Sequence, residues 1–304
     1  MMQHRTPDAT SPPLEVVHLS RSYGTTLALD DVSLTLEQGT AIAVVGPNGA
    51  GKTTLIECIL GLARPSRGEV LLLGTPPSLS EHAHEVGVVL ADSGFPPEVP
   101  VGALLELLGR VRGVDVWPMA ERFGLATLLA RPFETLSLGQ RQRVRLAIGL
   151  AGTPRLVVAD EPATALDLDA RTVLREVLDD HRARGAALLV ATHDLGEAEA
   201  IADRLFLLHR GRCLAYAPPA QVRRLAGIGE VRATLPGPYD PTAHEHLGAE
   251  LVAAEGLRVT LRARDTDALA HALLHQGAHS LEIAPLSLEH ALSALIDATE
   301  EVKQ

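Results

Sequence analysis

The sequence is short of lysine, cysteine and asparagine, and each shortage excludes something. Of 27 basic residues, only Lys52 and Lys303 are lysines, so the chain otherwise uses arginine. Cys58 and Cys213 stand far apart and alone, which fits neither a disulfide framework nor the spacing of a zinc site. Asn48 is the single asparagine, so the Asn-Lys-x-Asp motif by which a GTPase would read guanine is absent.

Long apolar runs and an excess of positive charge are missing as well. No stretch approaches the ~18 unbroken apolar residues of a membrane span, and the polar, proline-containing residues 1–13 carry no apolar segment of the signal-peptide type. A net charge of −11 argues against a nucleic-acid-binding protein, whose footprint is a basic patch. We therefore expect a cytoplasmic protein with a disordered tail over 1–13, no membrane span of its own and no nucleic-acid partner.

What is present is the pattern of an α/β protein. Apolar β-formers alternate with turn residues from Leu14 to about Leu72, and longer segments with helical periodicity follow. The continuous apolar runs at 154–160 and 186–194 each follow a helical segment and end in polar residues, which is typical of parallel strands buried on both faces. The pattern predicts a mixed sheet covered by helices, with ligands at the carboxyl ends of its strands.

A second, smaller domain is indicated beyond a break near residue 228. Residues 229–304 carry 12 acidic and 5 basic side chains and so contribute −7 of the net charge of −11. They alternate strand and helix patterns three times, which is enough for a small α+β module. We expect a main domain over 14–228 and an accessory, regulatory or dimerisation domain over 229–304.

The stretch "GPNGAGKTT" at 46–54 fits Gly-x-x-x-x-Gly-Lys-Thr, with a strand pattern before it and a helical pattern after it. Glycines let a backbone wrap closely around phosphate oxygens, and the helix that follows adds the positive end of its dipole. Lys52 is placed to reach the β- and γ-phosphates, and the Thr53 hydroxyl to ligate Mg²⁺. The predicted cradle comprises Gly46, Asn48, Gly49, Ala50, Gly51, Lys52, Thr53 and Thr54.

An adjacent pair of carboxylates, Asp160 and Glu161, closes the apolar run "LVVADE". Because side chains alternate along a strand, the two can do different work. Asp160 is predicted to hold Mg²⁺ together with Thr53, and Glu161 to act on the attacking water as general base. On its own such a pair is usually a solvated strand end, and its place after a buried strand downstream of the phosphate loop favours catalysis.

Between these motifs stands "LSLGQ", Leu136 to Gln140, at the start of a helical pattern. It resembles the Leu-Ser-Gly-Gly-Gln signature of ATP-binding cassette (ABC) proteins, and the order of the motifs over roughly 14–225 is similar to that family. The resemblance implies a P-loop NTPase cassette with a helical signature subdomain at about 95–150. It further implies nucleotide contacts from Tyr23 as a stacking aromatic, from the signature residues Ser137, Gly139 and Gln140, and from Asp167 of the D-loop. The switch histidine, His193, is implied as a catalytic residue.

The family resemblance also implies partners. ATP binds between two cassettes, so that Ser137 and Gly139 of one copy face the γ-phosphate held by Lys52 of the other. The chain is then an ATPase subunit that pairs with a second copy or a paralogue and docks on integral membrane permease subunits, peripherally at the cytoplasmic face of the inner or plasma membrane. The α+β tail resembles that of the bacterial drug- or lipid-exporter (daunorubicin-resistance-like) branch.

Ala91 departs from the family pattern, because the resemblance implies a Q-loop glutamine there. An alanine methyl cannot form a hydrogen bond. Asp92 could replace the glutamine only as a metal ligand, since it otherwise adds negative charge beside phosphate. We expect slower, less tightly coupled hydrolysis with nucleotide binding kept. Leu138 in the signature, and Ala163 and Ala165 before the D-loop, remove no group that the chemistry requires.

Two alternatives to the transport motor stay open. A soluble cassette of the DNA-repair or ribosome-associated kind would need a coiled-coil insertion or a second cassette with a basic linker, and neither is seen. A hydrolysis-impaired cassette that acts as a nucleotide-dependent regulatory or assembly module is kept open by Ala91. The tail histidines, "HEH" at 244–246 and His271, His275 and His279, are interpreted as a solvated face rather than a metal site.

Overall fold

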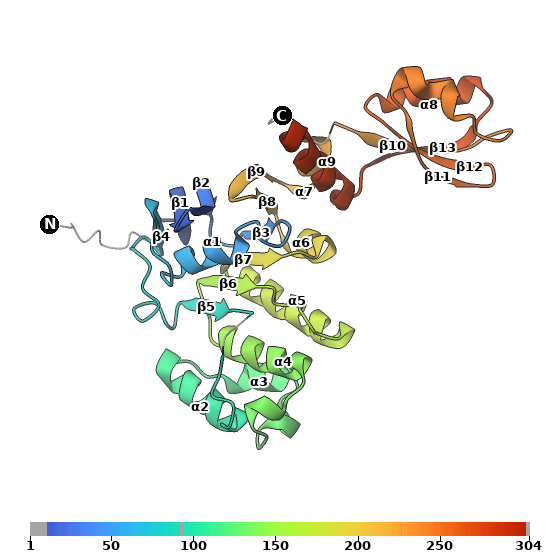
Figure 1. Ribbon diagram of the computed structural model, residues 1–304. Helices are drawn as coiled ribbons and strands as arrows, with labels where there is room; N and C mark the ends of the chain where they lie inside the picture. The colour runs from blue at the N-terminus through green and yellow to red at the C-terminus, as the bar shows by residue number, and fades with distance from the viewer. Residues whose placement is uncertain (1–10, 92–93, 226, 302–304) are drawn as a thin grey trace. The chain divides into compact units, whose positions relative to one another are not determined.

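The computed structural model describes residues 11–91, 94–225 and 227–301 and divides the chain into two compact units (Figure 1). The first unit runs to Tyr216 and the second begins at Ala217. Most of the tail expected to be disordered, and Asp92, lie outside the described residues.

A six-stranded sheet forms the centre of the first unit, in the order β5-β6-β7-β3-β8-β9. The pairs from β5 to β8 are parallel, and the two-residue connection between β8 and β9 makes them a hairpin. β3, β6 and β7 are buried along their whole length, as the apolar runs predict. The strands are β3 (Ala41–Val45), β5 (Val86–Val89), β6 (Leu156–Asp160), β7 (Ala187–Thr192), β8 (Arg204–His209) and β9 (Arg212–Ala217).

Alternation along these strands supplies two hydrophobic clusters, one on each face of the sheet. From β6, Leu156 and Val158 pack in one cluster, while Val157 and Ala159 pack in the other. The first cluster includes α1 (Lys52–Ile59) and a three-stranded antiparallel sheet, β2-β1-β4. The strands of that sheet are β1 (Leu14–Tyr23), β2 (Thr26–Leu36) and β4 (Arg67–Leu72).

The other cluster is built mainly from helices. α2, α3 and α4 gather at the end of the first unit that lies away from the β2-β1-β4 sheet, and α5 covers the central sheet (Figure 1). Apolar residues spaced three and four apart predicted these helices, except for the six-residue α3. They are α2 (Val101–Arg112), α3 (Trp117–Arg122), α4 (Leu138–Gly149) and α5 (Leu168–Ala183), with short 3-10 turns η1 (Ala126–Leu128) and η2 (Phe133–Thr135) between α3 and α4. α6 (Leu195–Ile201) follows β7.

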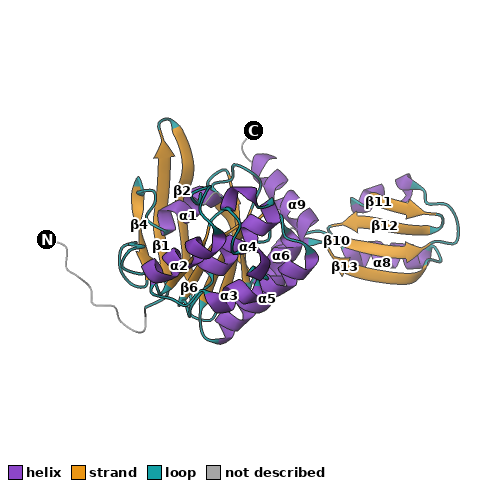
Figure 2. Cartoon of the chain, turned by 90° about the horizontal axis from the view of Figure 1, so that it is seen from below, coloured by secondary structure: helices purple, strands orange, loops and turns teal. Residues whose placement is uncertain are grey.

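The second unit has a four-stranded antiparallel sheet in the order β11-β12-β10-β13, with α8 against one face (Figure 2). Side chains of α8 and of the inner strands form a separate core. Its elements are α7 (Pro219–Leu225), β10 (Gly229–Thr234), the 3-10 helix η3 (Pro241–Leu247), β11 (Glu250–Glu255), β12 (Arg258–Ala263), α8 (Thr266–His275), β13 (His279–Pro285) and α9 (Leu288–Glu301).

Two features of this unit differ from the sequence expectation. β11 was not expected. All six of its residues are exposed, so its sequence does not show the alternation of apolar and polar residues that marks a half-buried strand. Pairing with β12 holds it as a strand. The chain divides between Tyr216 and Ala217 instead of near 228, because α7 packs against α9 and so belongs to the second unit.

No helix within the described ranges has both the length and the apolar character that crossing a bilayer requires.

Candidate functional site

The loop from Gly46 to Gly51 joins buried β3 to the start of α1, where the sequence predicts the phosphate cradle. Gly51 has φ +109, and a Cβ there would lie 2.6 Å from the carbonyl oxygen of Ala28. At Gly46 a Cβ would collide with the carbonyl oxygen of Leu208. Close backbone packing therefore requires both glycines, which stand at the two ends of this loop.

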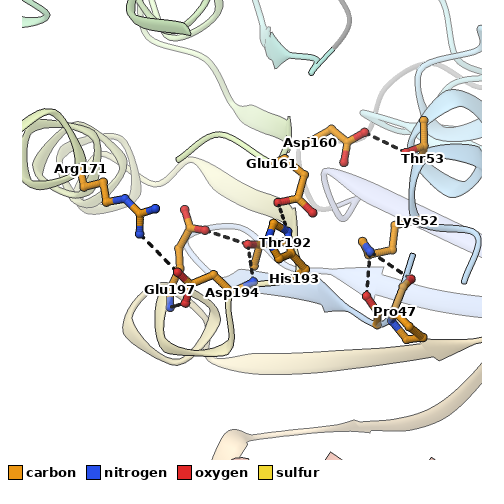
Figure 3. Close-up of polar contacts among 11 residues, drawn as sticks. Pro47, Lys52, Thr53, Asp160, Glu161, Arg171, Thr192, His193, Asp194 and Glu197 are labelled. Atoms are coloured by element: carbon orange, nitrogen blue, oxygen red, sulfur yellow. Dashed lines mark hydrogen bonds and ion pairs between the residues drawn. The ribbon is translucent and has the colours of Figure 1, made fainter. Parts of the chain in front are cut away.

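Lys52 is buried, with 8% of its surface exposed, and its ammonium group folds back on the loop. Nζ donates to the carbonyl oxygen of Gly46 at 2.7 Å and to that of Pro47 at 3.3 Å (Figure 3). These carbonyls hold the cation at the mouth of the cradle, where an anionic phosphate can take their place.

Thr53, in the first turn of α1, meets Asp160, at the carboxyl end of β6. The Thr53 hydroxyl donates to Asp160 Oδ2 at 3.1 Å (Figure 3). A hydroxyl and a carboxylate are hard oxygen ligands of the kind that Mg²⁺ binds alongside phosphate oxygens. The two side chains, which lie far apart in the sequence, thus fit a magnesium ion.

Glu161 directly follows β6 and has φ +50, a left-handed conformation that costs a non-glycine residue about 1–2 kcal/mol. Its N–H donates to the carbonyl oxygen of Ala191 in β7 at 2.8 Å, which holds the turn against the sheet. Glu161 Oε2 lies 2.7 Å from His193 Nδ1 (Figure 3). The strained turn therefore directs the carboxylate toward the histidine that follows β7.

A hydrogen-bond network fixes the segment that carries His193 (Figure 3). The Thr192 hydroxyl donates to Glu197 Oε2 at 2.8 Å and accepts from the Asp194 N–H at 3.1 Å. The Glu197 N–H donates to Asp194 Oδ1 at 3.0 Å, so Asp194 caps α6. That bond, aided by Arg171 at 3.3 Å, lowers the pKa of Asp194, whereas burial raises the pKa of Glu197.

Sequence reasoning missed this network. The signal was available, because an aspartate followed three residues later by a glutamate is the pattern of a helix N-terminus. The role of Arg171 in α5 could not be predicted, since no local sequence pattern relates it to Asp194.

A cavity of about 530 Å³ joins the phosphate loop to Asp160 and Glu161, while His193 lies outside its lining. Of the predicted residues, Asn48, Gly49, Gly51, Lys52, Thr53, Thr54, Asp160 and Glu161 line it. Ala91 lines it too, so the methyl group stands where the family pattern implies an amide. Sequence reasoning missed the remaining lining residues, Thr26, Leu27, Ala28, Arg210 and Gly211.

Tyr23 is not among the residues that line this cavity. Its hydroxyl donates to Glu57 Oε2 at 3.1 Å, and the guanidinium of Arg21 lies 4.3 Å from its ring centroid. The ring is 44% exposed. Stacking of Tyr23 on an adenine ring stays a prediction.

Ser137, Gly139 and Gln140 lie at the N-terminus of α4, and they too are outside the cavity lining. Ser137 and Gln140 form a reciprocal capping box: the Gln140 N–H donates to Ser137 Oγ at 3.2 Å and the Ser137 N–H donates to Gln140 Oε1 at 3.0 Å. A Cβ at Gly139 would lie 2.6 Å from the carbonyl oxygen of Ala165, so α4 closely approaches the segment before Asp167. Asp167 caps α5 by accepting from the Ala170 N–H at 2.8 Å.

The tail histidines do not form a metal site among the residues that the structure describes. His271 and His275 pack edge to face with ring centroids 4.5 Å apart. His244 is buried, 1% exposed, and stacks on Tyr239, so the expected solvated face is wrong for this histidine.

Comparison with known proteins gives a consistent family. The family described as "ABC transporter" matches residues 29–164. The Nod factor export ATP-binding protein I of Burkholderia lata is 34% identical, over 78% of this chain and 81% of that protein. The methionine import ATP-binding protein MetN of Mesorhizobium japonicum is 33% identical, over 85% of this chain and 74% of that protein.

A solved structure, described as the ATP-binding subunit of an ABC transporter, superimposes with a TM-score of 0.65. It is 30% identical, and the match covers 70% of this chain and 93% of that one. The predicted α/β nucleotide-binding cassette is thereby confirmed.

Proposed function

We propose, from the premise that this chain belongs to the ABC transporter family as an ATP-binding subunit with ATPase activity, that it is the motor of an exporter. In this proposal two copies, or one copy and a paralogue, close around two molecules of ATP with Mg²⁺. They drive separate membrane permease subunits from the cytoplasmic face of the inner or plasma membrane.

The observation that carries the motor function is the pair formed by Glu161 and His193 beside the Lys52 cradle. Lys52 binds the β- and γ-phosphates and offsets their charge. Glu161, held by His193 at 2.7 Å, accepts a proton from the water that attacks the γ-phosphate. Thr53 and Asp160 ligate Mg²⁺, which supplies neutralisation of phosphate charge when bound.

Dimerisation is supported by the place of the signature residues. Ser137 and Gly139 lie outside the cavity lining of their own copy, yet they form a helix N-terminus with anion-binding character. A second copy that brings this end of α4 over the γ-phosphate completes the site.

The export direction is supported by the similarity to the Nod factor export protein, and the methionine import protein is nearly as similar. Direction is therefore tested by transport. Once the permease partner is identified, vesicles that expose this chain outward should accumulate substrate upon ATP addition if the complex exports. ATP-dependent loss of preloaded substrate would overturn the export direction.

The proposed motor is tested with purified chain and the variant Glu161→Gln. Removal of the general base should lower phosphate release by at least about 100-fold while ATP binding is kept. ATP should convert the variant into a dimer, measured by sedimentation velocity, because turnover no longer opens it. A variant that binds ATP and stays monomeric, alone and with its paralogue, would contradict the proposed dimer.

The alternative is a regulatory or assembly module with impaired hydrolysis. One observation favours it: Ala91 contributes a methyl group to the cavity lining instead of an amide that could orient the water. A wild-type turnover no higher than that of Glu161→Gln would support this alternative over the motor.

A further inference from the structure

We propose that Arg210, in the turn between β8 and β9, is a further nucleotide-binding residue whose guanidinium contacts the polyphosphate of the nucleotide near its α-phosphate. The inference rests on nucleotide binding in this cavity. It is independent of dimerisation and of the direction of transport.

Two groups of residues line the cavity. One surrounds Lys52 and Asp160, where the β- and γ-phosphates and Mg²⁺ are expected. The second surrounds Ala28 and Gly211, which lie so close that a Cβ on Gly211 would be 2.7 Å from the carbonyl oxygen of Ala28. A nucleotide whose terminal phosphates occupy the first group extends its α-phosphate and ribose toward the second, where Arg210 is exposed.

The turn that carries Arg210 is fixed to the phosphate loop and to β2. The Gly211 N–H donates to the carbonyl oxygen of Ala50 at 2.9 Å, and the Asp30 N–H donates to the carbonyl oxygen of Gly211 at 2.8 Å. Arg210 therefore stands on backbone that moves together with the cradle. Binding a nucleotide therefore orders the Arg210 side chain without having to order the turn that carries it.

The backbone conformation of Arg210 also points to a use for its side chain. Arg210 and Gly211 have φ +46 and +78, so the hairpin has the positive φ angles of a type I′ turn. Asparagine, aspartate and glycine are preferred at such positions, and arginine is strained there. A strained residue beside a ligand cavity is a common mark of function.

Charge supports the same assignment. Of the described lining residues, Lys52 and Arg210 are basic, and Asp160 and Glu161 are acidic, so the lining has no net positive charge. A nucleoside triphosphate is strongly anionic, and a cationic side chain forms charge-assisted hydrogen bonds to phosphate oxygens. Arg210 supplies the second cation that the polyphosphate requires.

The same turn offers a matched control, Arg212. Arg212 lies on the other side of Gly211, and its Nε donates to Asp30 Oδ2 at 2.7 Å. It does not line the cavity. The two arginines therefore share a turn, and only one of them faces the nucleotide.

The test compares binding of ADP and of adenosine to the full chain by calorimetry, with Mg²⁺ present. Arg210→Gln should weaken ADP on the order of tenfold, the effect of losing a charge-assisted hydrogen bond, and leave adenosine unchanged. Arg210→Lys should recover most of the loss, and Arg212→Gln should bind ADP like the wild type.

The proposal is overturned if Arg210→Gln binds ADP as tightly as the wild type does, or if ADP and adenosine weaken equally. Thermal unfolding midpoints of the variants show that the turn is intact, and failure of Arg210→Lys to recover ADP binding also counts against the phosphate contact. If the wild type itself binds no ADP, the nucleotide function fails, and the result is distinguishable from failure of Arg210 alone.

Discussion

The side-chain amide of Gln142 donates a hydrogen bond to the carbonyl oxygen of Pro162 at 2.9 Å. Gln142 is in α4 and is 4% exposed, and Pro162 directly follows Glu161. A buried bond therefore connects the helix that begins at the signature to the residue next to the proposed general base. A displacement of α4 is therefore expected to shift the backbone next to Glu161.

Gln142→Leu should lower the free energy of unfolding by about 1–3 kcal/mol, because a buried carbonyl loses its donor. Urea titration followed by the fluorescence of Trp117, the single tryptophan, measures this loss. The exposed Gln38 provides the control, since Gln38→Leu should change stability by less than about 0.5 kcal/mol. Turnover should fall more than ATP affinity, and equal stability of the two variants would contradict a buried bond.

Lys52→Arg tests whether the cradle needs a compact cation. The ammonium group lies against the carbonyl oxygens of Gly46 and Pro47. With nucleotide bound it is expected between two phosphates, where a planar guanidinium does not fit. We expect ATP hydrolysis to fall by roughly 10²-fold or more, as far as in Lys52→Met. Lys303→Arg is the matching exchange at the other lysine and should be silent. Wild-type hydrolysis by Lys52→Arg would show that charge alone suffices.

Ala91→Gln should raise ATP turnover on the order of tenfold, since an amide at the cavity wall can orient the attacking water. The change in transport-coupled turnover is measured by phosphate release in the presence of the permease partner. Ala91→Leu adds similar bulk without a donor or acceptor and should give no gain. If Gln and Leu leave turnover at the same value, the missing amide is not what limits hydrolysis.

The predictable parts of the site are those formed by residues that follow one another in the sequence. Strand, glycine loop, Lys52 and Thr53 follow one another, and the pair Asp160 and Glu161 closes a buried run. Backbone geometry then places them at the carboxyl ends of β3 and β6, two parallel strands of the same sheet that flank β7. The α/β class and most helices followed from periodicity for the same reason.

The unpredictable parts depend on contacts between distant segments. The second group of the cavity lining comes from the start of β2 and from the turn that contains Arg210, and no local pattern relates them. β11 exists only because β12 pairs with it, and burial of His244 depends on Tyr239 folding over it. The proposed roles of Tyr23, Ser137, Gly139 and Asp167 stay predictions, because they concern contacts with a nucleotide or a second copy.

His181 in α5 is expected to make the first unit sensitive to acid. It is 1% exposed, and its Nε2 donates to the carbonyl oxygen of Leu150 at 2.9 Å. Burial lowers the pKa of His181 below its ordinary value of 6.5; Arg184 and Arg122 add to this, while the Leu150 bond and Asp180 oppose it. The folded state therefore binds fewer protons than the unfolded state as the pH falls below about 6.5, so acid should lower stability through this group.

The variant His181→Gln separates this effect from general acid denaturation. A glutamine amide can still donate to Leu150 and does not titrate, so the variant should lose less stability than the wild type between pH of about 7.5 and about 5.5. Urea midpoints read from Trp117 fluorescence measure the difference within the first unit, where that residue lies. His271→Gln, at an exposed histidine of the second unit, should keep the wild-type pH dependence. Parallel pH profiles for His181→Gln and the wild type would show that His181 does not titrate on unfolding.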